Sequence, residues 1–203
     1  MAVDQSGTSS VALPVGRELW TRVFAVAPLV VIGTKEHDGG FDFAPKHMAM
    51  PLGWEPYYCF VCGPSHATYH NIRSHREFTV CVPRPEQIVE SSLAAGSRDA
   101  DGGKPGLAAL RATPGRIVDA PVLEGCTLAL ECELERIVDG FGENSLIVGR
   151  VVAATASRDA IREADADDAD LIHRLGLLAY VAPGRVAVVR ESTAFPYAAD
   201  FRT

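Results

Sequence analysis

The stretch of sequence that decides the fold is residues 28–83, which read PLVVIGTKEHDGGFDFAPKHMAMPLGWEPYYCFVCGPSHATYHNIRSHREFTVCVP. Two apolar runs within it, residues 29–33 and 57–62, have the length and composition of β-strands. The second run ends in a Gly-Pro pair and leads into a short predicted helix that carries Thr68-x-x-Asn71. Free N–H groups at a helix N-terminus attract anions, so this strand-to-helix junction can present donors to a phosphate.

Strands continue through the second half of the chain. In residues 126–135 the side chains alternate with the period of two that a half-buried antiparallel strand requires, and the core-facing set is Cys126, Leu128, Leu130, Cys132 and Leu134. Residues 139–144 predict a hairpin turn, after which residues 145–154 return as a more fully buried strand. Residues 177–181 and 185–189 predict a last strand pair around a Pro-Gly turn.

Few helices are expected around these strands. Leu19, Trp20, Val23 and Phe24 repeat at helical spacing and predict a short amphipathic helix that ends near Pro28. Residues 85–95 have helical character, and the acidic residues 159–170 predict a solvated helix or loop. Residues 96–106 are rich in glycine and aspartate and predict a mobile loop without core-forming residues, placed to cover a pocket mouth.

This order of elements favours a mainly β fold, an antiparallel barrel with Greek-key connections and a few peripheral helices, over an alternating βαβ sheet. The chain has 203 residues, of which 47% are hydrophobic, and this is enough to bury the core of one β-rich domain. We therefore expect a flexible leader over residues 1–14 and a single domain over residues 15–203.

Charge and cysteine content narrow the partners and the compartment. The net charge of −7 argues against nucleic acid and anionic membranes, because both require basic patches. No run approaches the length of a membrane span, and the N-terminus lacks the basic and apolar regions of a secretory signal. Five cysteines, an odd number, fit a reducing cytoplasm better than a disulfide framework. A small-molecule partner in the cytoplasm is the expectation.

Several weak motifs occur in an order that resembles the flavin reductase-like, FMN-binding split-barrel family, which includes flavin reductases and flavoredoxins. They are Gly40-Phe-Asp42-Phe-Ala44-Pro45-Lys-His47, then Glu55-Pro56, then Thr68-x-x-Asn71-Ile72, then Glu77-Phe78-Thr-Val80. Residues 121–123, 126–135 and 143–152 are similar to the family's later strands, so the likeness covers residues 19–190 approximately. It implies a split barrel and a non-covalent FMN.

The resemblance also implies which residues contact the cofactor. In the family, the segment matching residues 44–48 lines the flavin ring and ribityl chain, and the phosphate-contacting threonine falls on Thr68. The cofactor contacts expected on this basis are Phe43, Ala44, Pro45, Lys46, His47, Met48, Cys62, Gly63, His66, Thr68 and Asn71. Two positions depart from the family pattern: Asp42 replaces a common asparagine, and His47 replaces a common serine or threonine. For His47 a flavin contact, a substrate-side role and plain packing all stay open.

Simpler interpretations accompany these assignments. Ser65 can be an ordinary helix cap with Asn71 solvated, whereas in the phosphate-site interpretation His66 adds a positive charge. His66 and His70 share one helix face, but without a HExxH or paired CxxC pattern no metal site is expected. Cys59 and Cys62 would point to opposite faces of a strand, so both are expected to be structural thiols.

The function that the resemblance implies is an NAD(P)H-dependent flavin reductase, in which hydride passes from nicotinamide to flavin, with a partner monooxygenase as one acceptor of the reduced flavin. It also implies a homodimer, whose second subunit completes the pocket through residues 96–106 or through Phe195, Tyr197 and Phe201; packing of this tail on its own subunit is the alternative. A flavin-binding electron carrier or sensor, or a split barrel that binds a deazaflavin or haem, are the other hypotheses. The choice of NADH or NADPH and the final acceptor stay open.

Overall fold

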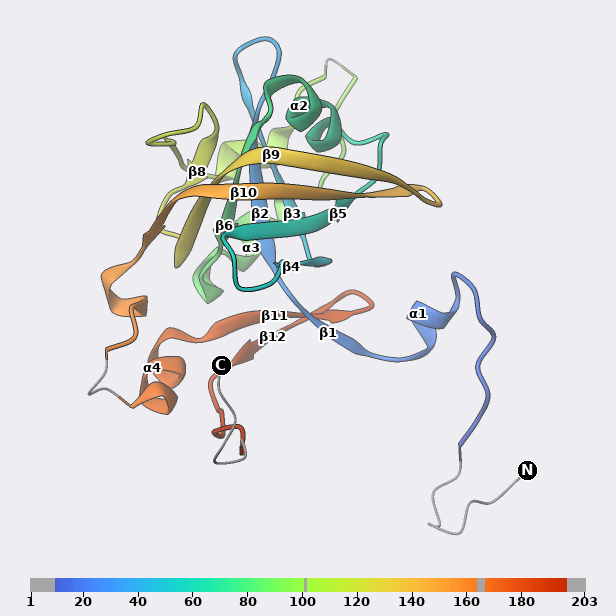
Figure 1. Ribbon diagram of the computed structural model, residues 1–203, viewed down its shortest axis with the longest axis vertical. Helices are drawn as coiled ribbons and strands as arrows, with labels where there is room; N and C mark the ends of the chain where they lie inside the picture. The colour runs from blue at the N-terminus through green and yellow to red at the C-terminus, as the bar shows by residue number, and fades with distance from the viewer. Residues whose placement is uncertain (1–9, 101, 164–166, 197–203) are drawn as a thin grey trace.

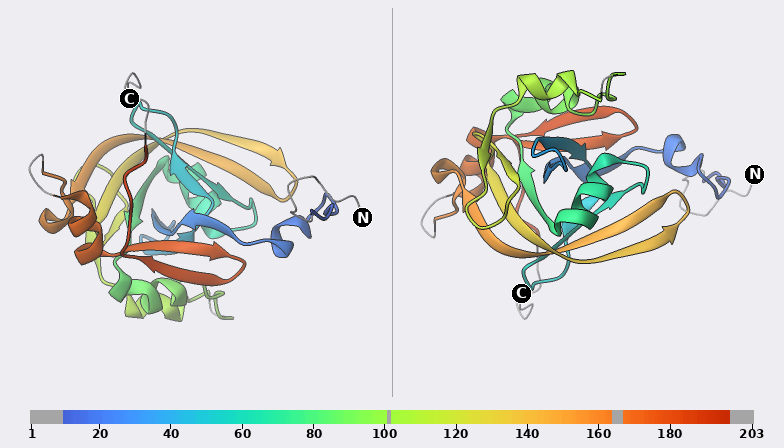
Figure 2. Two further views of the ribbon diagram at one scale, coloured as in Figure 1. Left: turned by 90° about the horizontal axis from the view of Figure 1, so that it is seen from below. Right: turned by 90° about the horizontal axis from the view of Figure 1, so that it is seen from above.

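The computed structural model describes residues 10–100, 102–163 and 167–196. Its main element is a seven-stranded antiparallel sheet that curls into a half-barrel (Figures 1 and 2). The strand order is β3-β2-β6-β9-β10-β5-β4. The bounds are β2 Val30–Lys35, β3 Phe41–Lys46, β4 Ala49–Pro51, β5 Tyr57–Cys62, β6 Glu77–Val82, β9 Leu128–Phe141 and β10 Asn144–Ala156. The prediction of a mainly β, antiparallel split barrel with peripheral helices is confirmed.

The long hairpin of β9 and β10 crosses the whole sheet and joins β6 to β5 (Figure 1). Its turn is the predicted one, tightened to two residues, Gly142 and Glu143. Strand β9 is confirmed, but the expected half-buried pattern is wrong in its first part, where Ala129 and Glu131 on the other face are buried too. The hairpin of β7 (Ala112–Pro114) and β8 (Pro121–Leu123), which contacts β6, supplies the additional cover.

The core has two parts. The larger cluster fills the concave side of the barrel and includes Phe60 and Phe78, whose rings meet edge to face with centroids 5.5 Å apart. The smaller cluster includes Val31, Phe43, Cys81 and Leu123 and lies under the β7–β8 hairpin and the helix after β6. Strand β2 supplies residues to both clusters, because successive side chains of a strand point to opposite faces.

Glu131 is a charged residue in this core, and it ties the β7–β8 hairpin to β9. Its side chain is 2% exposed, and its Oε2 accepts hydrogen bonds from the backbone nitrogens of Ile117 (2.7 Å) and Val118 (3.0 Å). Burial acts to raise the pKa of Glu131, but the bonds from Ile117, Val118 and Arg116 outweigh it, so the pKa lies below its ordinary value. The carboxylate is therefore a structural acceptor.

The depressed pKa makes the contribution of Glu131 depend on pH. A carboxyl whose folded-state pKa is lowered stabilises the fold above its unfolded pKa, about 4.3, and loses that contribution as pH falls through the folded pKa. We expect Glu131→Ala to lower the free energy of unfolding by about 2 kcal/mol at pH 7, because the backbone N–H groups of Ile117 and Val118, the latter buried, lose their acceptor. Urea denaturation at pH 7 and at pH 3 checks this. An equal deficit of Glu131→Ala at both pH values would contradict the assignment.

A second, three-stranded sheet lies beside the half-barrel (Figure 1). It consists of β1 (Ala25–Pro28), β11 (Leu177–Ala182) and β12 (Arg185–Val189), in the order β1-β11-β12, so the predicted last strand pair is confirmed. The predicted N-terminal helix is wrong in length: α1 spans Leu19–Arg22 only. The following residues form β1 instead, because their backbone pairs with β11.

The remaining helices lie at the periphery. They are α2 (Ala67–His75), η1 (Pro85–Gln87), α3 (Ile88–Leu93), η2 (Pro105–Ala109), η3 (Arg158–Ala160) and α4 (Asp168–Leu175). The predicted helical character of residues 85–95 is confirmed by η1 and α3. In the part of the chain that the structure describes, none of the helices combines the length and apolarity needed to cross a bilayer. Within the predicted leader, residues 10–14 have no regular secondary structure; residues 1–9, Tyr197 and Phe201 lie outside the described residues.

Candidate functional site

A pocket of about 500 Å³ opens where the end of β3, the start of α2 and the segment after α3 meet. Strand β3 is held there by antiparallel pairing with β2, which places Ile32 opposite Ala44 and Val31 opposite Pro45. The residues that line the pocket are Asp42, Ala44, Pro45, Lys46, Ser65, His66, Ala67, Thr68, Ala94, Ala95, Gly96, Ser97, Arg98 and Lys104. This strand-to-helix junction is the one that the sequence predicts as an anion site.

The first turn of α2 forms one wall of the pocket. The chain turns at Gly63, whose carbonyl accepts a hydrogen bond of 3.0 Å from the nitrogen of His66, and then enters the helix. A Cβ at Gly63 would lie 3.2 Å from the carbonyl oxygen of Glu143, so the close approach of this turn to the β9–β10 turn favours glycine. His66 occupies the N-cap position and makes no side-chain cap bond. The alternative that Ser65 caps the helix is therefore wrong.

Basic side chains from two segments meet in the pocket. Lys104 Nζ lies 2.7 Å from Asp42 Oδ1 and donates to the carbonyl of Phe43 at 2.7 Å. Arg98 pairs with Glu36 and lies 3.8 Å from Asp42, and Lys46 lies on the pocket wall. Because Lys104 neutralises Asp42 and Arg98 neutralises Glu36, the charge of Lys46 is left to attract an anion.

His66 contributes differently from the prediction. Burial lowers the pKa of His66, and the nearby charges of Lys46 and Lys104 lower it further. The imidazole is therefore neutral near pH 7, so the expected positive charge is wrong for the site as it stands in this structure. A neutral ring still offers one N–H donor to a ligand.

Five of the eleven predicted contact residues line this pocket: Ala44, Pro45, Lys46, His66 and Thr68. Four others are elsewhere in the protein. Phe43 and Cys62 are core side chains, and Met48 is 54% exposed outside the pocket. Asn71 is buried rather than solvated, and its amide donates a 3.0 Å hydrogen bond to Thr34 Oγ1, which fastens α2 to β2. Gly63 forms the turn that leads into α2.

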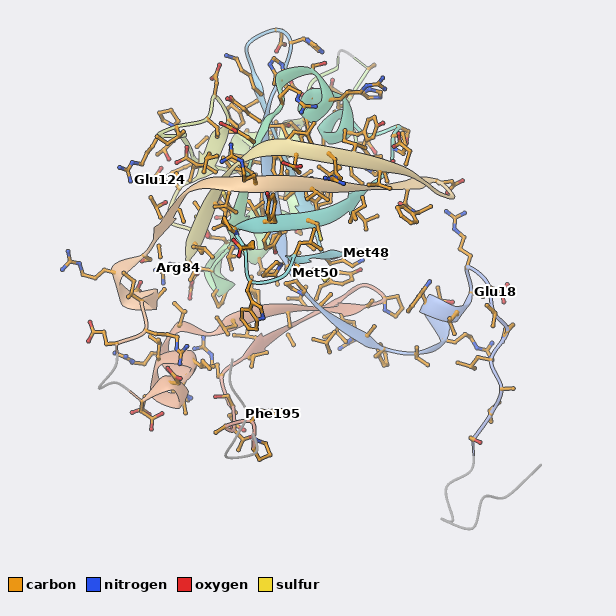
Figure 3. The ribbon with its side chains drawn as sticks, viewed as in Figure 1. Glu18, Met48, Met50, Arg84, Glu124 and Phe195 are labelled. Carbon is orange, nitrogen blue, oxygen red and sulfur yellow. The ribbon has the colours of Figure 1, made fainter. Side chains whose placement is uncertain are left out.

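His47 lies outside this pocket, between the two sheets. Its ring stacks on Tyr180 of β11, with centroids 4.2 Å apart and planes 23° apart. Burial, followed by the charge of Lys46, lowers the pKa of His47, so its ring is neutral near pH 7. Of the three roles left open by the sequence, packing is the one for which the structure gives a partner. Met48 and Met50 follow His47 in the sequence. Figure 3 shows both methionines on the side of the half-barrel that faces the three-stranded sheet.

All five cysteines are free. Cys59 and Cys62 lie three residues apart on β5, and both are buried. Burial raises the pKa of each thiol above its ordinary value. They therefore have the character of structural thiols, as expected.

The cations Arg98 and Lys104 were missing from the residues predicted for the site. They come from the glycine-rich loop that was predicted to cover a pocket mouth, and its described residues do line the pocket, within the same subunit. The loop was expected to carry no core-forming residues, and none of its described residues belongs to the two core clusters, but the Lys104 side chain is only 8% exposed. Two basic residues in an otherwise Gly/Asp-rich loop were the available signal.

The fold and the pocket define a class, a split-barrel protein with a pocket at the start of α2. The model of the family described as "Flavin reductase like domain" matches residues 24–180. The chain therefore belongs to the flavin reductase-like family, and membership supports a flavin-related oxidoreductase function.

Solved structures agree on the fold. Nitrilotriacetate monooxygenase component B from Bacillus cereus has a TM-score of 0.78 at 16% identity, covering 92% of this chain and 100% of that one. Flavoredoxin of Desulfovibrio vulgaris has a TM-score of 0.74 at 20% identity, covering 93% and 99%. The FMN-binding protein from Thermus thermophilus, with bound 1-cyclohex-2-enone, has a TM-score of 0.73 at 23% identity, covering 93% and 99%. At these identities the likeness shows the fold alone.

Proposed function

We propose that this protein binds FMN non-covalently and reduces it with NAD(P)H, and that the pocket at the start of α2 holds the FMN phosphate. The chemistry of the pocket supports the fit. It combines the uncapped first turn of a nine-residue helix with the hydroxyl residues Ser65 and Thr68 and the cation Lys46. Backbone N–H groups, hydroxyls and a lysine are the donors that bind a phosphate dianion. This donor set is the observation that carries the proposal.

Each wall of the pocket has its own part in binding. The helix N-terminus and Thr68 would donate to the phosphate, and residues 44–46, which line the same pocket, would hold the rest of the flavin. Lys104 and Arg98 keep the acidic groups Asp42 and Glu36 paired, so that they repel the phosphate less. A bound flavin supplies a ring that accepts hydride from a nicotinamide, and the protein's task is then to position and shield the two. No general base is needed among these residues.

Replacing Thr68 tests the phosphate site directly. We expect Thr68→Ala to weaken FMN binding by about 1–3 kcal/mol, because a buried charge-assisted hydrogen bond is lost. Thr68→Ser is the matched control: it keeps the hydroxyl and should bind FMN nearly as well as the wild type. Flavin fluorescence titration of the folded variants measures both. Equal affinities of the alanine and serine variants would remove Thr68 from the site.

We also propose that the protein is a homodimer, assembled through the three-stranded sheet. All five residues of β12 are exposed, and so are Trp20, Phe24 and Val26 at the start of the chain. A three-stranded sheet needs an apolar face packed on something to be stable. A second copy of the chain, which offers the same apolar surface, would supply that cover by two-fold symmetry.

The dimer proposal predicts a change of oligomeric state in a surface variant. Val188→Asp places a charge on the exposed apolar sheet and is expected to shift the protein from dimer to monomer at micromolar concentration. Ile117→Asp is the control, because Ile117 is an exposed apolar residue on the β7–β8 hairpin, away from this sheet. Light scattering coupled to size-exclusion chromatography reports the mass. A monomeric wild type, or a dimeric Val188→Asp protein, would contradict the interface.

The similarity to a flavoredoxin favours a second candidate function. In this alternative the protein is a flavin-binding electron carrier that does not react efficiently with NAD(P)H. Anaerobic addition of NADH and then NADPH to the FMN-loaded protein separates the two. Rapid bleaching of the flavin absorbance with either nucleotide supports the reductase, and bleaching with dithionite alone supports the carrier. Failure of both nucleotides to bleach the flavin would contradict the reductase activity but not the proposed FMN site.

Two further parts of the proposal concern the surroundings of the enzyme. One is that a monooxygenase receives the reduced flavin, as the similarity to a monooxygenase component suggests. The other is that the protein works in the cytoplasm, where a reducing environment keeps all five thiols free.

A further inference from the structure

The Cys81 and Cys126 side chains lie together at one edge of the smaller core cluster, away from the flavin pocket. Cys81 is on β6 and fully buried, whereas Cys126 is half-buried just before β9 and packs against the same cluster. The two thiols are close enough to shift each other's pKa. The Cys81 sulfur also accepts from the nitrogen of Leu123 at 3.3 Å, which holds it beneath the turn that carries Cys126.

A small molecule can reach Cys126 from outside. Cys126 lines a hollow of about 300 Å³, together with the hydroxyl residues Thr113, Thr155 and Ser157 and the carboxylate of Glu124. Three hydroxyl groups at the wall suit a small oxygen-rich ligand. Cys81 does not line this hollow, so an oxidant would meet Cys126 first.

A fixed cation lies beside Cys126. Arg84 donates from Nε to the carbonyl of Gly125 at 3.0 Å and from its terminal nitrogen to Ser157 (2.6 Å) and Asp159 (2.7 Å). The neighbouring Cys81 thiol lowers the pKa of the Cys126 thiol, and the charge of Arg84 adds to this against the effect of burial. For Cys81, its neighbour Cys126 and burial raise the pKa. Ionisation is therefore favoured at the outer sulfur over the inner one.

We propose that Cys126 and Cys81 form a peroxide-oxidised pair, in which Cys126 is the attacking thiolate and Cys81 the resolving thiol. The Cys126 sulfur attacks one oxygen of hydrogen peroxide, the O–O bond breaks, and a sulfenic acid and one water are formed. The Cys81 sulfur then attacks the sulfenic sulfur, the S–S bond forms, and the hydroxyl leaves as a second water with the Cys81 proton. Two thiols lose two electrons, and the peroxide is reduced to water.

Reduced flavin reacts with dioxygen to give hydrogen peroxide, so the proposed function would place the oxidant close at hand. The inference does not depend on that function, because the test adds the peroxide directly and uses no nucleotide or flavin. Full-length protein is treated with hydrogen peroxide, alkylated and digested. The expected product is a disulfide-linked peptide pair that contains Cys81 and Cys126, with Cys59, Cys62 and Cys132 still alkylated.

Variants assign the roles of the two sulfurs. Cys126→Ser should slow thiol loss at least about tenfold, because the accessible thiolate is gone. In Cys81→Ala, the sulfenic acid of Cys126 should persist and be trapped by dimedone. Cys59→Ala is the matched control and should oxidise like the wild type. No Cys81–Cys126 disulfide, a different pairing, or an unchanged rate in Cys126→Ser would each overturn the proposal.

Discussion

Lys104→Met is expected to lower the free energy of unfolding by about 3 kcal/mol, the loss that is typical when one partner of a buried ion pair is removed. The Lys104 side chain is 8% exposed and that of Asp42 is 3% exposed, with 2.7 Å between Nζ and Oδ1. Methionine keeps most of the apolar stem but leaves the Asp42 carboxylate facing only Arg98, at 3.8 Å. The carbonyl of Phe43 also loses its donor. Urea denaturation at neutral pH measures the loss.

The double variant Asp42→Asn, Lys104→Met is the control for this prediction. Removing the carboxylate charge together with the lysine abolishes the unpaired buried ion, so most of the lost stability should return. Measuring FMN affinity separates the contribution of the Lys104–Asp42 pair to binding from its contribution to stability. In the single variant it should fall at least about tenfold, because an unpaired Asp42 repels the phosphate. A single variant as stable as the double variant would show that the pair is solvated rather than buried.

Gly33→Ala is expected to lower the free energy of unfolding by about 3 kcal/mol and to damage the pocket at the start of α2 as well. A Cβ at Gly33 would lie 2.3 Å from the carbonyl oxygen of Pro121 and 2.5 Å from Thr79 Oγ1. These two atoms are themselves joined by a 2.5 Å hydrogen bond, which fastens β8 to β6. Neither atom can move away without breaking that bond, so β2 has to shift.

The shift would reach the pocket because β2 pairs with β3. Ile32, next to Gly33, lies opposite Ala44 of the pocket wall. Thermal denaturation and FMN titration of Gly33→Ala should therefore both show losses. Gly16→Ala is the control, since a Cβ there meets no atom within 4 Å. A Gly33→Ala protein with wild-type stability would contradict the close approach of β2 and β8.

The strands were predictable from the sequence where their pattern is local. The apolar run of residues 57–62 gave β5 with its observed bounds, and a period of two identified β9. What local pattern cannot show is which elements cover a strand. In the alternating pattern of β9, Ala129 and Glu131 fall on the face that was expected to be exposed. They are buried because the separate β7–β8 hairpin folds over them. The length of the N-terminal helix was wrongly predicted for the same reason, because local pattern does not show that β11 pairs with the residues that form β1.

The candidate site was predictable where it is built from one continuous segment. The junction from β5 to α2 and the strand β3 are both formed by residues 28–83, and five of the expected contacts meet there. Lys104 and Arg98 were not assigned to the site from the sequence, because only the fold brings these two side chains to Asp42. The bond from the Asn71 amide to Thr34, which links α2 to β2, also depends on the fold and could not be read from the sequence. The contact of Asn71 with a cofactor stays a prediction.

The central claim is that the pocket at the start of α2 binds the phosphate of FMN. The most direct measurement is an equilibrium titration of the purified protein with FMN and, in parallel, with riboflavin, which has the same ring and ribityl chain but no phosphate. We expect FMN to bind at least about 100-fold more tightly, because several charge-assisted hydrogen bonds to the phosphate together contribute about 3 kcal/mol or more. Equal affinity for the two flavins would contradict the claim.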